Sequence, residues 1–291
     1  MKQSQMKHFK CLACGSDRCR PYYQGCRDYY LGLGQPVDYV ACAGCGLVQQ
    51  WPVPEDVSPF YLDYPVHVRR TVVQRFARRV LQRQVYFRPS PAMAAGTLLD
   101  FGCGDGVYLR EMEGRFARRV GYEPGAAHAA RLAESTGLPI YHDVAALSAE
   151  WKGRVDVVVA HYVMEHVTDL HAAMRCFADV LVPGGLLHIA VPHVRSWEAR
   201  LFKRAWHGLD APRHISFPDE TVFRRLGSEH GFDPPACSPA IFPNTLAASI
   251  CTALTGGYHG GLFNLLILPS WCVAALAPTG TMVYQMTKRK S

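Results

Sequence analysis

Short apolar segments alternate with helical patterns through the central half of the chain. The segments have the length of buried strands and cover 97–101, 119–123, 139–143, 155–161 and 186–191. Helical patterns follow them, beginning near residue 107 and covering 126–135, roughly 170–181, and 218–231. This alternation predicts an α/β fold, a parallel sheet with both faces covered by helices, and such sheets bind ligands at the carboxyl ends of their strands.

The C-terminal part of the chain is uncharged over a long stretch. Residues 234–287 contain no Asp, Glu, Lys or Arg. Their longest apolar run, about 16 residues, contains Asn264 and Pro269, whereas a membrane-spanning helix needs roughly 20 apolar residues. We therefore expect a pair of helices lying in one membrane leaflet, with Trp271 and Tyr258 at the interface. A lid or a dimer surface is the alternative.

Positive charge is concentrated before the first of these strands. The segment from Arg69 to Arg88 contains seven arginines and no acid, so its charge equals the whole formal net charge of +7. Apolar residues recur there at helical spacing, which predicts an amphipathic helix with a basic outer face, ended by Pro89 and Pro91. Such a face is compatible with plain solvation, with an anionic membrane surface, or with a phosphorylated substrate or nucleic acid.

The composition excludes two broad classes of protein. With 49% hydrophobic and 19% charged residues and a mean hydropathy of -0.03, the chain is too apolar for a disordered protein and too polar for a multi-span membrane protein. The basic first ten residues precede no apolar run, so no export signal is predicted. Eleven cysteines, an odd number, favour metal ligands and buried thiols over a secreted disulfide scaffold. We expect a cytoplasmic protein.

Four of the cysteines have metal-ligand spacing. Cys11 and Cys14 form one CxxC pair, Cys42 and Cys45 form another, and a glycine follows each pair. Two such turns complete a tetrahedral site of four thiolates, the pattern of a zinc ribbon. Four protein ligands leave no open position for water, so the predicted zinc is structural. The alternative is a set of free or redox-active thiols.

A glycine loop and two acids follow the first three predicted strands. The loop reads Gly102-Cys-Gly104-Asp-Gly106, a shorter spacing than the dinucleotide fingerprint. Glycines directly after a strand let a ligand approach the backbone closely. Glu123, at the end of the second strand, has the place of a carboxylate that binds ribose hydroxyls, and Asp143, at the end of the third, can contact an adenine amine. Together they suggest an adenosine-containing cofactor.

These segments resemble class I S-adenosylmethionine-dependent methyltransferases. LLDFGCGDGVYL resembles the first motif of that family, Gly121-Tyr-Glu123-Pro the second, and HYVMEHVTD with LVPGGLLHIAVP the later ones. The cysteine pairs, in CLACGS and CAGCGLVQQWPVP, resemble a zinc-ribbon subgroup that includes sugar C-methyltransferases and envelope-biosynthesis methyltransferases. The resemblance implies a Rossmann-like sheet of seven strands with the last antiparallel. We expect the final two strands at 236–242 and 281–287, with the uncharged segment inserted between them.

The resemblance also implies a set of cofactor contacts. The methionine and ribose portion would be lined by Asp100, Gly102, Gly104 and Gly106. Glu123 would bind the ribose, Asp143 and Val144 the adenine, and His161 and Tyr162 would close over the cofactor.

Two histidines are candidates for the chemistry. S-adenosylmethionine supplies the electrophile, so the protein must place a nucleophile and, where needed, remove its proton. His166 follows the fourth strand and His214 lies between the fifth strand and the next helix; a structural role is the alternative for each. In the sugar C-methyltransferases a Glu-His pair occupies the second position, but here Arg213 precedes His214. The sequence thus predicts that the orienting acid is missing and that Arg213 is able to hold a substrate phosphate.

The function predicted from the sequence is methyl transfer from S-adenosylmethionine to a small-molecule or lipid-linked acceptor, such as a sugar, a quinone-like molecule or an envelope precursor, at oxygen or carbon. The basic helix and the apolar insertion together favour peripheral attachment to the inner face of the membrane. An RNA methyltransferase is the alternative, although no Asn-Pro-Pro-Tyr motif for base amines is present, so nucleic acid is not the expected partner. A zinc-ribbon scaffold without activity is a further alternative, opposed by the intact glycine loop.

The expected division of the chain has five parts. They are a zinc ribbon (1–54), a linker with the basic helix (55–91), the methyltransferase core (92–242), the apolar helical insertion (243–280), and the final strand with a basic tail (281–291).

Overall fold

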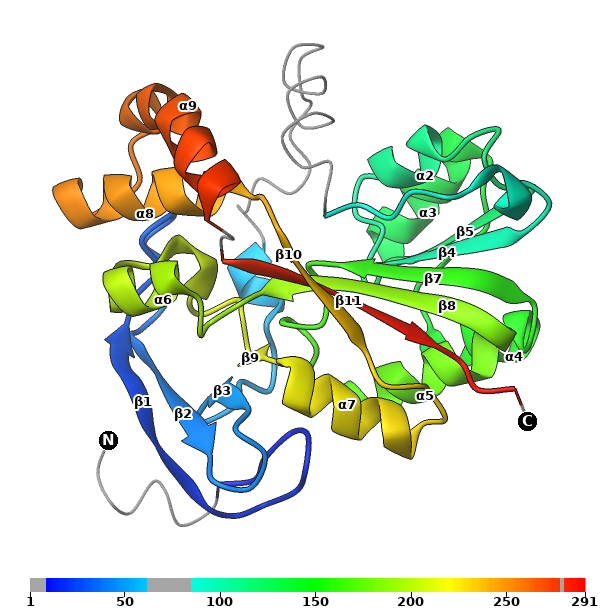
Figure 1. Cartoon of the computed structure of the whole chain (residues 1–291), viewed down its shortest axis with the longest axis horizontal. Helices are drawn as coiled ribbons and strands as arrows, with labels where there is room; N and C mark the ends of the chain where they lie inside the picture. Colours follow the sequence, from blue (N-terminus) through cyan, green and yellow to red (C-terminus); the bar gives the residue numbers. More distant parts are fainter. Residues whose placement is uncertain (1–8, 62–84, 278–279, 291) are drawn as a thin grey trace.

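The computed structural model describes residues 9–61, 85–277 and 280–290. A large sheet with helices on both faces occupies one side of the molecule, and a smaller N-terminal sheet lies beside it (Figure 1). A pair of helices near the C-terminus packs above the smaller sheet. The molecule thus contains an α/β core, a smaller N-terminal sheet and a helical pair formed by the uncharged segment.

The large sheet has seven strands in the order β10-β11-β8-β7-β4-β5-β6. They are β4 (Thr97–Phe101), β5 (Arg118–Tyr122), β6 (Ile140–Tyr141), β7 (Val155–His161), β8 (Leu181–Pro192), β10 (Ala236–Ala240) and β11 (Thr281–Thr287). The five strands from β4 to β8 are parallel to one another, and β11 runs antiparallel to both of its neighbours, β8 and β10. The predicted seven-stranded fold with an antiparallel last strand is confirmed.

Helices cover both faces of this sheet because its central strands carry apolar side chains on both sides. Leu99 and Val158 face a core shared with α4, α5 and α7, whereas Leu98 and Val157 pack with residues of α2 and the segment before β4. The helices are α2 (Val107–Glu111), α3 (Ala126–Thr136), α4 (Val144–Trp151), α5 (Leu170–Val180), α6 (Trp197–Phe202), α7 (Glu220–Glu229), α8 (Pro243–Thr255) and α9 (Gly260–Leu276). Short 3₁₀ turns are η2 (Ser58–Tyr61), η4 (Pro91–Met93), η5 (Lys203–Ala205) and η6 (His207–Leu209).

The predicted bounds differ from the observed ones where a cap or a bulge intervenes. Helix α7 begins at Glu220, two residues after the predicted Pro218, because the Asp219 side chain accepts the backbone N–H of Val222 and caps the helix. Strand β8 begins at Leu181, five residues before its predicted start, and the register with β7 shifts at this extension. The bounds of β4, β7 and β11 agree with the prediction.

The small sheet contains one strand that the division at residue 54 does not anticipate. Its order is β1 (Cys19–Cys26), β2 (Val37–Cys42), β3 (Val48–Gln50) and β9 (Ser216–Phe217). Strand β9 belongs to the segment between β8 and α7, and it pairs antiparallel with β3. The N-terminal module is therefore continuous, by backbone hydrogen bonds, with a loop of the methyltransferase core.

The basic helix predicted from Arg69 to Arg88 falls largely outside the described residues, which omit 62–84. The four residues at its described end, 85–88, are not helical. They lie across the large sheet, where Val85 O is 2.9 Å from His188 Nε2 and Phe87 O accepts the hydroxyl of Tyr108 at 2.9 Å.

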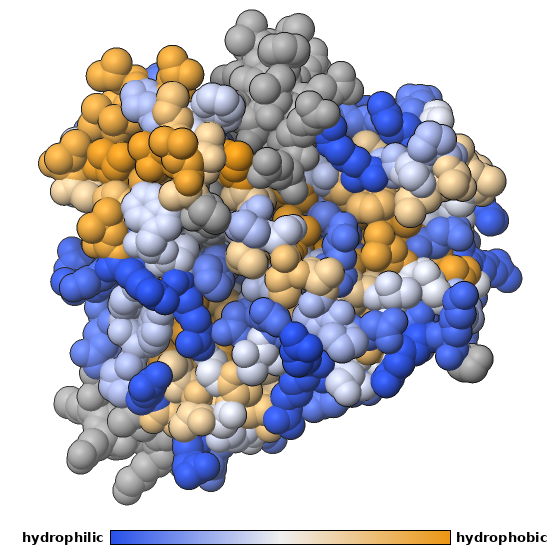
Figure 2. Space-filling view, viewed as in Figure 1, coloured by the Kyte–Doolittle hydropathy of each residue, from blue (hydrophilic) through white to orange (hydrophobic). Residues whose placement is uncertain are grey.

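The uncharged insertion forms the predicted helical pair, α8 and α9. Most of α8 is buried, whereas α9 exposes large apolar side chains: Leu265 is 72% exposed, Leu268 69% and Leu276 90%. Figure 2 shows the resulting apolar surface at the upper left of the molecule. In the part of the chain that the structure describes, no helix is both long enough and apolar enough to cross a bilayer.

Candidate active site

The glycine loop after β4 has a backbone that only glycine adopts readily. Gly102, Gly104 and Gly106 have φ values of 79°, 52° and 68°, in the left-handed region. A Cβ at Gly102 would collide with Val163, whereas a Cβ at Gly104 would meet no atom within 4 Å. The loop is thus packed against the segment after β7 on one side, and at Gly104 its backbone borders open space that a ligand can approach.

The acids predicted to contact the cofactor lie at the carboxyl edge of the same sheet. Asp100 is buried near the end of β4. Glu123 directly follows β5, and its Oε2 accepts the backbone N–H of Gly104 at 3.1 Å. Asp143 caps α4 by accepting the N–H of Ala146 at 2.7 Å, and Val144 is the first residue of that helix. The structure therefore gathers these residues at one edge, around the glycine loop.

His161 is the last residue of β7 and Tyr162 follows it; β7 lies on the side of β4 opposite to β5. The backbone φ of Tyr162 is 58°, a conformation uncommon for residues other than glycine and frequent at functional sites. Its hydroxyl lies 3.2 Å from the hydroxyl of Thr281, and its ring packs against Phe242. The ring of His161 lies among three other rings at centroid distances of 4.9–5.2 Å: Tyr86, Tyr108 and His188. Closure over a cofactor stays a prediction for both.

The two candidate histidines meet. His166, in the loop after β7, and His214, two residues before β9, have ring centroids 4.7 Å apart. Glu165 joins them, and one ligand atom from each of the three residues lies within 4.8 Å of the others. Val163, two residues before Glu165, lies against Gly102, so the segment that carries Glu165 and His166 passes the glycine loop.

Backbone carbonyl groups fix the orientation of both imidazole rings. His166 Nδ1 is 3.0 Å from the carbonyl oxygen of Arg213, and His214 Nδ1 is 2.9 Å from that of Gly208. A carbonyl oxygen only accepts, so each neutral ring carries its proton on Nδ1 and a lone pair on Nε2. Burial lowers the pKa of His214 to about 3 and also lowers the pKa of His166, which keeps both rings neutral at pH 7.

An acid accompanies His214, contrary to the sequence prediction. Its Nε2 is 4.0 Å from Glu165 Oε1 and 3.8 Å from Asp210 Oδ2. The residue before His214 is Arg213, so neither acid is at the preceding position. Glu165 lies in the loop after β7, and Asp210 lies four residues before His214. Glu165 is fully buried, its burial raises its pKa well above the usual value, and neither carboxyl oxygen has a hydrogen-bond partner among the described residues.

The proposal that Arg213 holds a substrate phosphate is wrong. Its side chain is completely buried and is engaged by two carboxylates: Nη1 is 2.7 Å from Asp28, and Nη2 is 2.6 Å from Asp210. Although burial opposes ionisation of Asp210, these hydrogen bonds outweigh it and lower the pKa of that acid to about 2. Arg213 therefore holds the loop that carries His214, and no guanidinium nitrogen is directed at a substrate.

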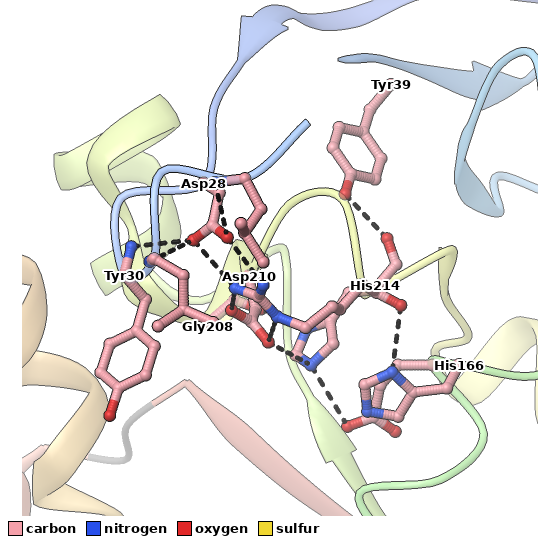
Figure 3. A network of polar contacts seen from close by, with 11 residues as sticks. Asp28, Tyr30, Tyr39, His166, Gly208, Asp210 and His214 are labelled. Atoms are coloured by element: carbon pink, nitrogen blue, oxygen red, sulfur yellow. Dashed lines mark hydrogen bonds and ion pairs between the residues drawn. The ribbon is translucent and has the colours of Figure 1, made fainter. Parts of the chain in front are cut away.

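The N-terminal module supports the same loop at three points that the sequence reasoning missed. Asp28 pairs with Arg213, and the hydroxyl of Tyr39 donates to the carbonyl oxygen of His214 at 2.7 Å (Figure 3). The backbone N–H of Gln50 donates to Ile215 O at 2.7 Å. No local signal marks these contacts, because each joins residues more than 160 positions apart.

The four predicted metal ligands converge. Cys11 Sγ lies 3.5 Å from Cys45 Sγ, Cys14 Sγ lies 3.6 Å from Cys42 Sγ, and all four sulfurs are within 4.8 Å of one another. Thiolates at the corners of a tetrahedron with metal–sulfur distances of about 2.3 Å have spacings of this size. The donor set and its geometry therefore fit a tetrahedral zinc ion.

A family model described as a methyltransferase domain matches residues 70–234, more than half of the chain. The chain belongs to this family of methyltransferases, and the class predicted from the sequence, an S-adenosylmethionine-dependent methyltransferase, is confirmed.

Curated relatives match up to about half of the chain. The chain is 30% identical over 153 residues to the ubiquinone biosynthesis O-methyltransferase of Bradyrhizobium sp. (strain ORS 278), covering 51% of this chain and 58% of the relative. It is 36% identical over 107 residues to the protein of the same name from Methylobacterium sp. (strain 4-46), covering 35% and 43%. The chain thus spans about half the length of the curated relatives it matches.

A solved structure supports the fold. A chain from the complex between the Haloferax volcanii Trm112 methyltransferase activator and a methyltransferase superposes with a TM-score of 0.51 at 14% sequence identity. The match covers 75% of this chain and 92% of that chain.

Proposed function

We propose that this protein transfers a methyl group from S-adenosylmethionine to a hydroxyl oxygen of a small-molecule or lipid-linked acceptor. Bound S-adenosylmethionine supplies an electrophilic methyl group, so the chain must bind the cofactor and handle the acceptor's proton. One observation carries the proposal: the segment that brings Glu165 and His166 together with His214 passes the glycine loop, at the sheet edge where such folds bind ligands. The names of the curated relatives support oxygen as the acceptor atom.

The cofactor half of the site fits an adenosyl group. Gly104 borders open space where a ligand can reach the backbone, and Glu123 is held beside it by a hydrogen bond to its N–H. In the proposal, Asp100 with the three loop glycines contacts the methionine and ribose portion, Glu123 the ribose, and Asp143 with Val144 the adenine. His161 and Tyr162 cover the remaining side.

Calorimetric titration with S-adenosylmethionine tests this half. We expect the wild-type chain to bind the cofactor and Glu123→Ala to lose at least tenfold in affinity, because charge-assisted hydrogen bonds contribute about 1.5–3 kcal/mol. Glu113→Ala, which removes an acid whose side chain is 76% exposed, is the control. A wild-type chain that does not bind, or equal binding by wild type and Glu123→Ala, contradicts the proposal.

The acceptor half of the site contains the two histidines. When a hydroxyl oxygen takes a methyl group, its proton must leave, and groups within hydrogen-bond reach of that oxygen facilitate the loss. His166 and His214 present lone pairs on Nε2, since both Nδ1 atoms face carbonyl oxygens. We assign the handling of the acceptor hydroxyl to these two residues together with Glu165.

We further propose that α9 attaches the protein to a membrane surface and brings it near an apolar acceptor. The helix has no charged residue and exposes Leu265, Leu268 and Leu276, and large exposed apolar patches mark contact sites for membranes or other proteins. Trp271 is 37% exposed on the same helix, but Tyr258 packs against Tyr30 of the N-terminal module and anchors the helical pair to it.

Flotation with liposomes that contain anionic lipid tests the attachment. We expect the wild-type chain to float and the triple variant Leu265→Gln, Leu268→Gln, Leu276→Gln to stay at the bottom. A wild-type chain that stays at the bottom contradicts the proposal. If the wild-type chain does not float but forms dimers as its concentration rises, the exposed face of α9 serves self-association instead.

For the cysteine cluster we propose a structural zinc ion. All four ligand positions would be filled by Cys11, Cys14, Cys42 and Cys45, so this ion would stabilise the N-terminal module and take no part in methyl transfer.

A further inference from the structure

We propose that Glu165, His166 and His214 form a second metal site, which binds a divalent first-row transition cation such as Zn²⁺. The inference begins with Glu165, which is fully buried and has no hydrogen-bond partner for either carboxyl oxygen among the described residues. A buried carboxyl group without partners is costly, and an ion is one of the standard explanations for such a group.

The two imidazole rings are arranged as metal ligands are. Metal-binding histidines usually hold one ring nitrogen by a hydrogen bond to a carbonyl or carboxylate, which fixes the tautomer and directs the other nitrogen at the ion. Here His166 Nδ1 faces the carbonyl oxygen of Arg213 and His214 Nδ1 faces that of Gly208. With the proton on Nδ1, each ring carries its lone pair on Nε2, and His214 Nε2 is 4.0 Å from Glu165 Oε1.

The spacing and the ligand types select the class of cation. One ligand atom from each of the three residues lies within 4.8 Å of the other two, and a tetrahedral ion with ligand bonds of about 2.0–2.2 Å would draw these atoms to about 3.3–3.6 Å from one another. Two imidazoles and one carboxylate suit zinc and its first-row neighbours better than magnesium or calcium, which prefer oxygen ligands only.

The environment holds the ligands in place without competing for the ion. Asp210 lies 3.8 Å from His214 Nε2, but both of its oxygens accept hydrogen bonds from Arg213. Arg213 is in turn held by Asp28. The loop that carries His214 is therefore fixed by a buried network of charges, and Glu165 is the acid that is left for the cation.

Three protein ligands leave coordination positions open, unlike the four cysteines. An oxygen of the acceptor can occupy one of them, and a bound cation would lower the pKa of such an oxygen so that it gives its proton to water. The imidazole lone pairs, which would handle that proton if no ion were bound, then serve as ligands. This role for the ion rests on the proposed function, but the existence of the site does not. The site would then act on the acceptor through the cation, with the imidazoles as ligands.

Elemental analysis of the full-length protein, equilibrated with micromolar free Zn²⁺, tests the site. We expect two zinc ions per chain in the wild type and one in Glu165→Gln and in His214→Ala. Glu198→Gln is the matched control, because Glu198 is also a completely buried acid but lies on α6, outside the cluster. One zinc per chain in the wild type, or two in Glu165→Gln, overturns the proposal.

A spectroscopic measurement on the wild type keeps the test independent of how the variants fold. Zinc X-ray absorption should show nitrogen or oxygen ligands at about 2.0–2.1 Å in addition to sulfur at about 2.3 Å. A sulfur-only spectrum overturns the second site. Failure of the proposed function is a separate result, because it appears as absent binding of S-adenosylmethionine whatever the zinc content.

Discussion

The cysteine cluster and the Glu165–His166–His214 cluster both gather metal-ligating side chains, but their ligands come together by different routes. In the first, two tight CxxC turns bring the sulfurs close within a small N-terminal module. In the second, the ligands come from two loops of the core, 48 positions apart, and each loop depends on the surrounding fold. The first cluster is therefore specified by local spacing and the second by tertiary structure.

The coordination that each cluster offers also differs. Four cysteines fill a tetrahedron, which suits an ion that stabilises the fold, whereas two histidines and one acid leave room for a substrate. The two clusters are linked, since β3 of the N-terminal module pairs with β9, which begins two residues after His214. The N-terminal module, which contains the cysteine cluster, thus supports the loop that carries His214.

Breaking the cysteine cluster should have the largest effect. Structural zinc contributes an apparent 10–16 kcal/mol or so in small zinc modules, and we expect Cys42→Ser to unfold the N-terminal module. Because β9 pairs with β3, the loop carrying His214 should become sensitive to protease at the same time. Limited proteolysis followed by mass spectrometry measures both.

Cys237→Ser is the control, because that cysteine is exposed and lies far from the cluster in sequence. Cleavage confined to the first 54 residues of Cys42→Ser, with the segment around residues 210–217 still protected, would mean that the two clusters are independent.

Removing Asp28 should have the next largest effect, because it separates the N-terminal module from the loop without touching either cluster. Asp28→Asn leaves the buried Arg213 with one of its two carboxylates, and breaking a buried ion pair typically costs about 3–5 kcal/mol. Urea unfolding should show a loss of this order. Glu220→Gln, which breaks an exposed ion pair with Arg224, should cost less than about 1 kcal/mol.

Equal stability of Asp28→Asn and Glu220→Gln would show that the buried pair contributes no more than a surface pair. In that case the N-terminal module would not be what holds the loop of His214.

A smaller effect on stability is expected from replacing Glu198, a buried acid outside both clusters. This replacement tests how far burial alone shifts the pKa of a carboxyl group. Burial raises its pKa to about 7, so between pH 4.5 and 7 the folded chain binds a proton that the unfolded chain releases. Its contribution to stability is therefore complete below about pH 4.5 and is lost as the pH rises through 7. When the pH is raised from 5 to 8, the free energy of unfolding should fall by roughly 2–3 kcal/mol more in the wild type than in Glu198→Gln.

Urea unfolding at the two pH values measures this difference. If the wild type and Glu198→Gln lose the same stability, the burial of Glu198 does not govern its ionisation, and burial becomes a weaker argument for Glu165 as well.

Much of the fold follows from local patterns in the sequence. Strands β4 and β7 have the bounds that their apolar segments predict, and the four cysteines converge as their spacing predicts. The cofactor edge followed from the positions of Glu123 and Asp143 after their strands. These features depend on residues near one another in the chain.

Most of the contacts that local patterns did not reveal are long-range; those of Asp210, three residues before Arg213 and four before His214, are the local exception. The sequence does not reveal that Arg213 is engaged by Asp28, because this partner lies 185 residues away. The acid for His214 was sought at the preceding position, but Glu165 provides it from another loop. Strand β9 is only two residues long and has no periodicity to detect. Each of these contacts depends on which loops the sheet brings together.

Methyl transfer from labelled S-adenosylmethionine to molecules in a lipid extract tests the central claim most directly. The wild type should transfer label to an organic-soluble product, and Glu165→Gln should bind the cofactor with unchanged affinity but lose label transfer by at least a hundredfold. Equal label transfer by Glu165→Gln, His214→Ala and the wild type would contradict the claim that this cluster acts on the acceptor.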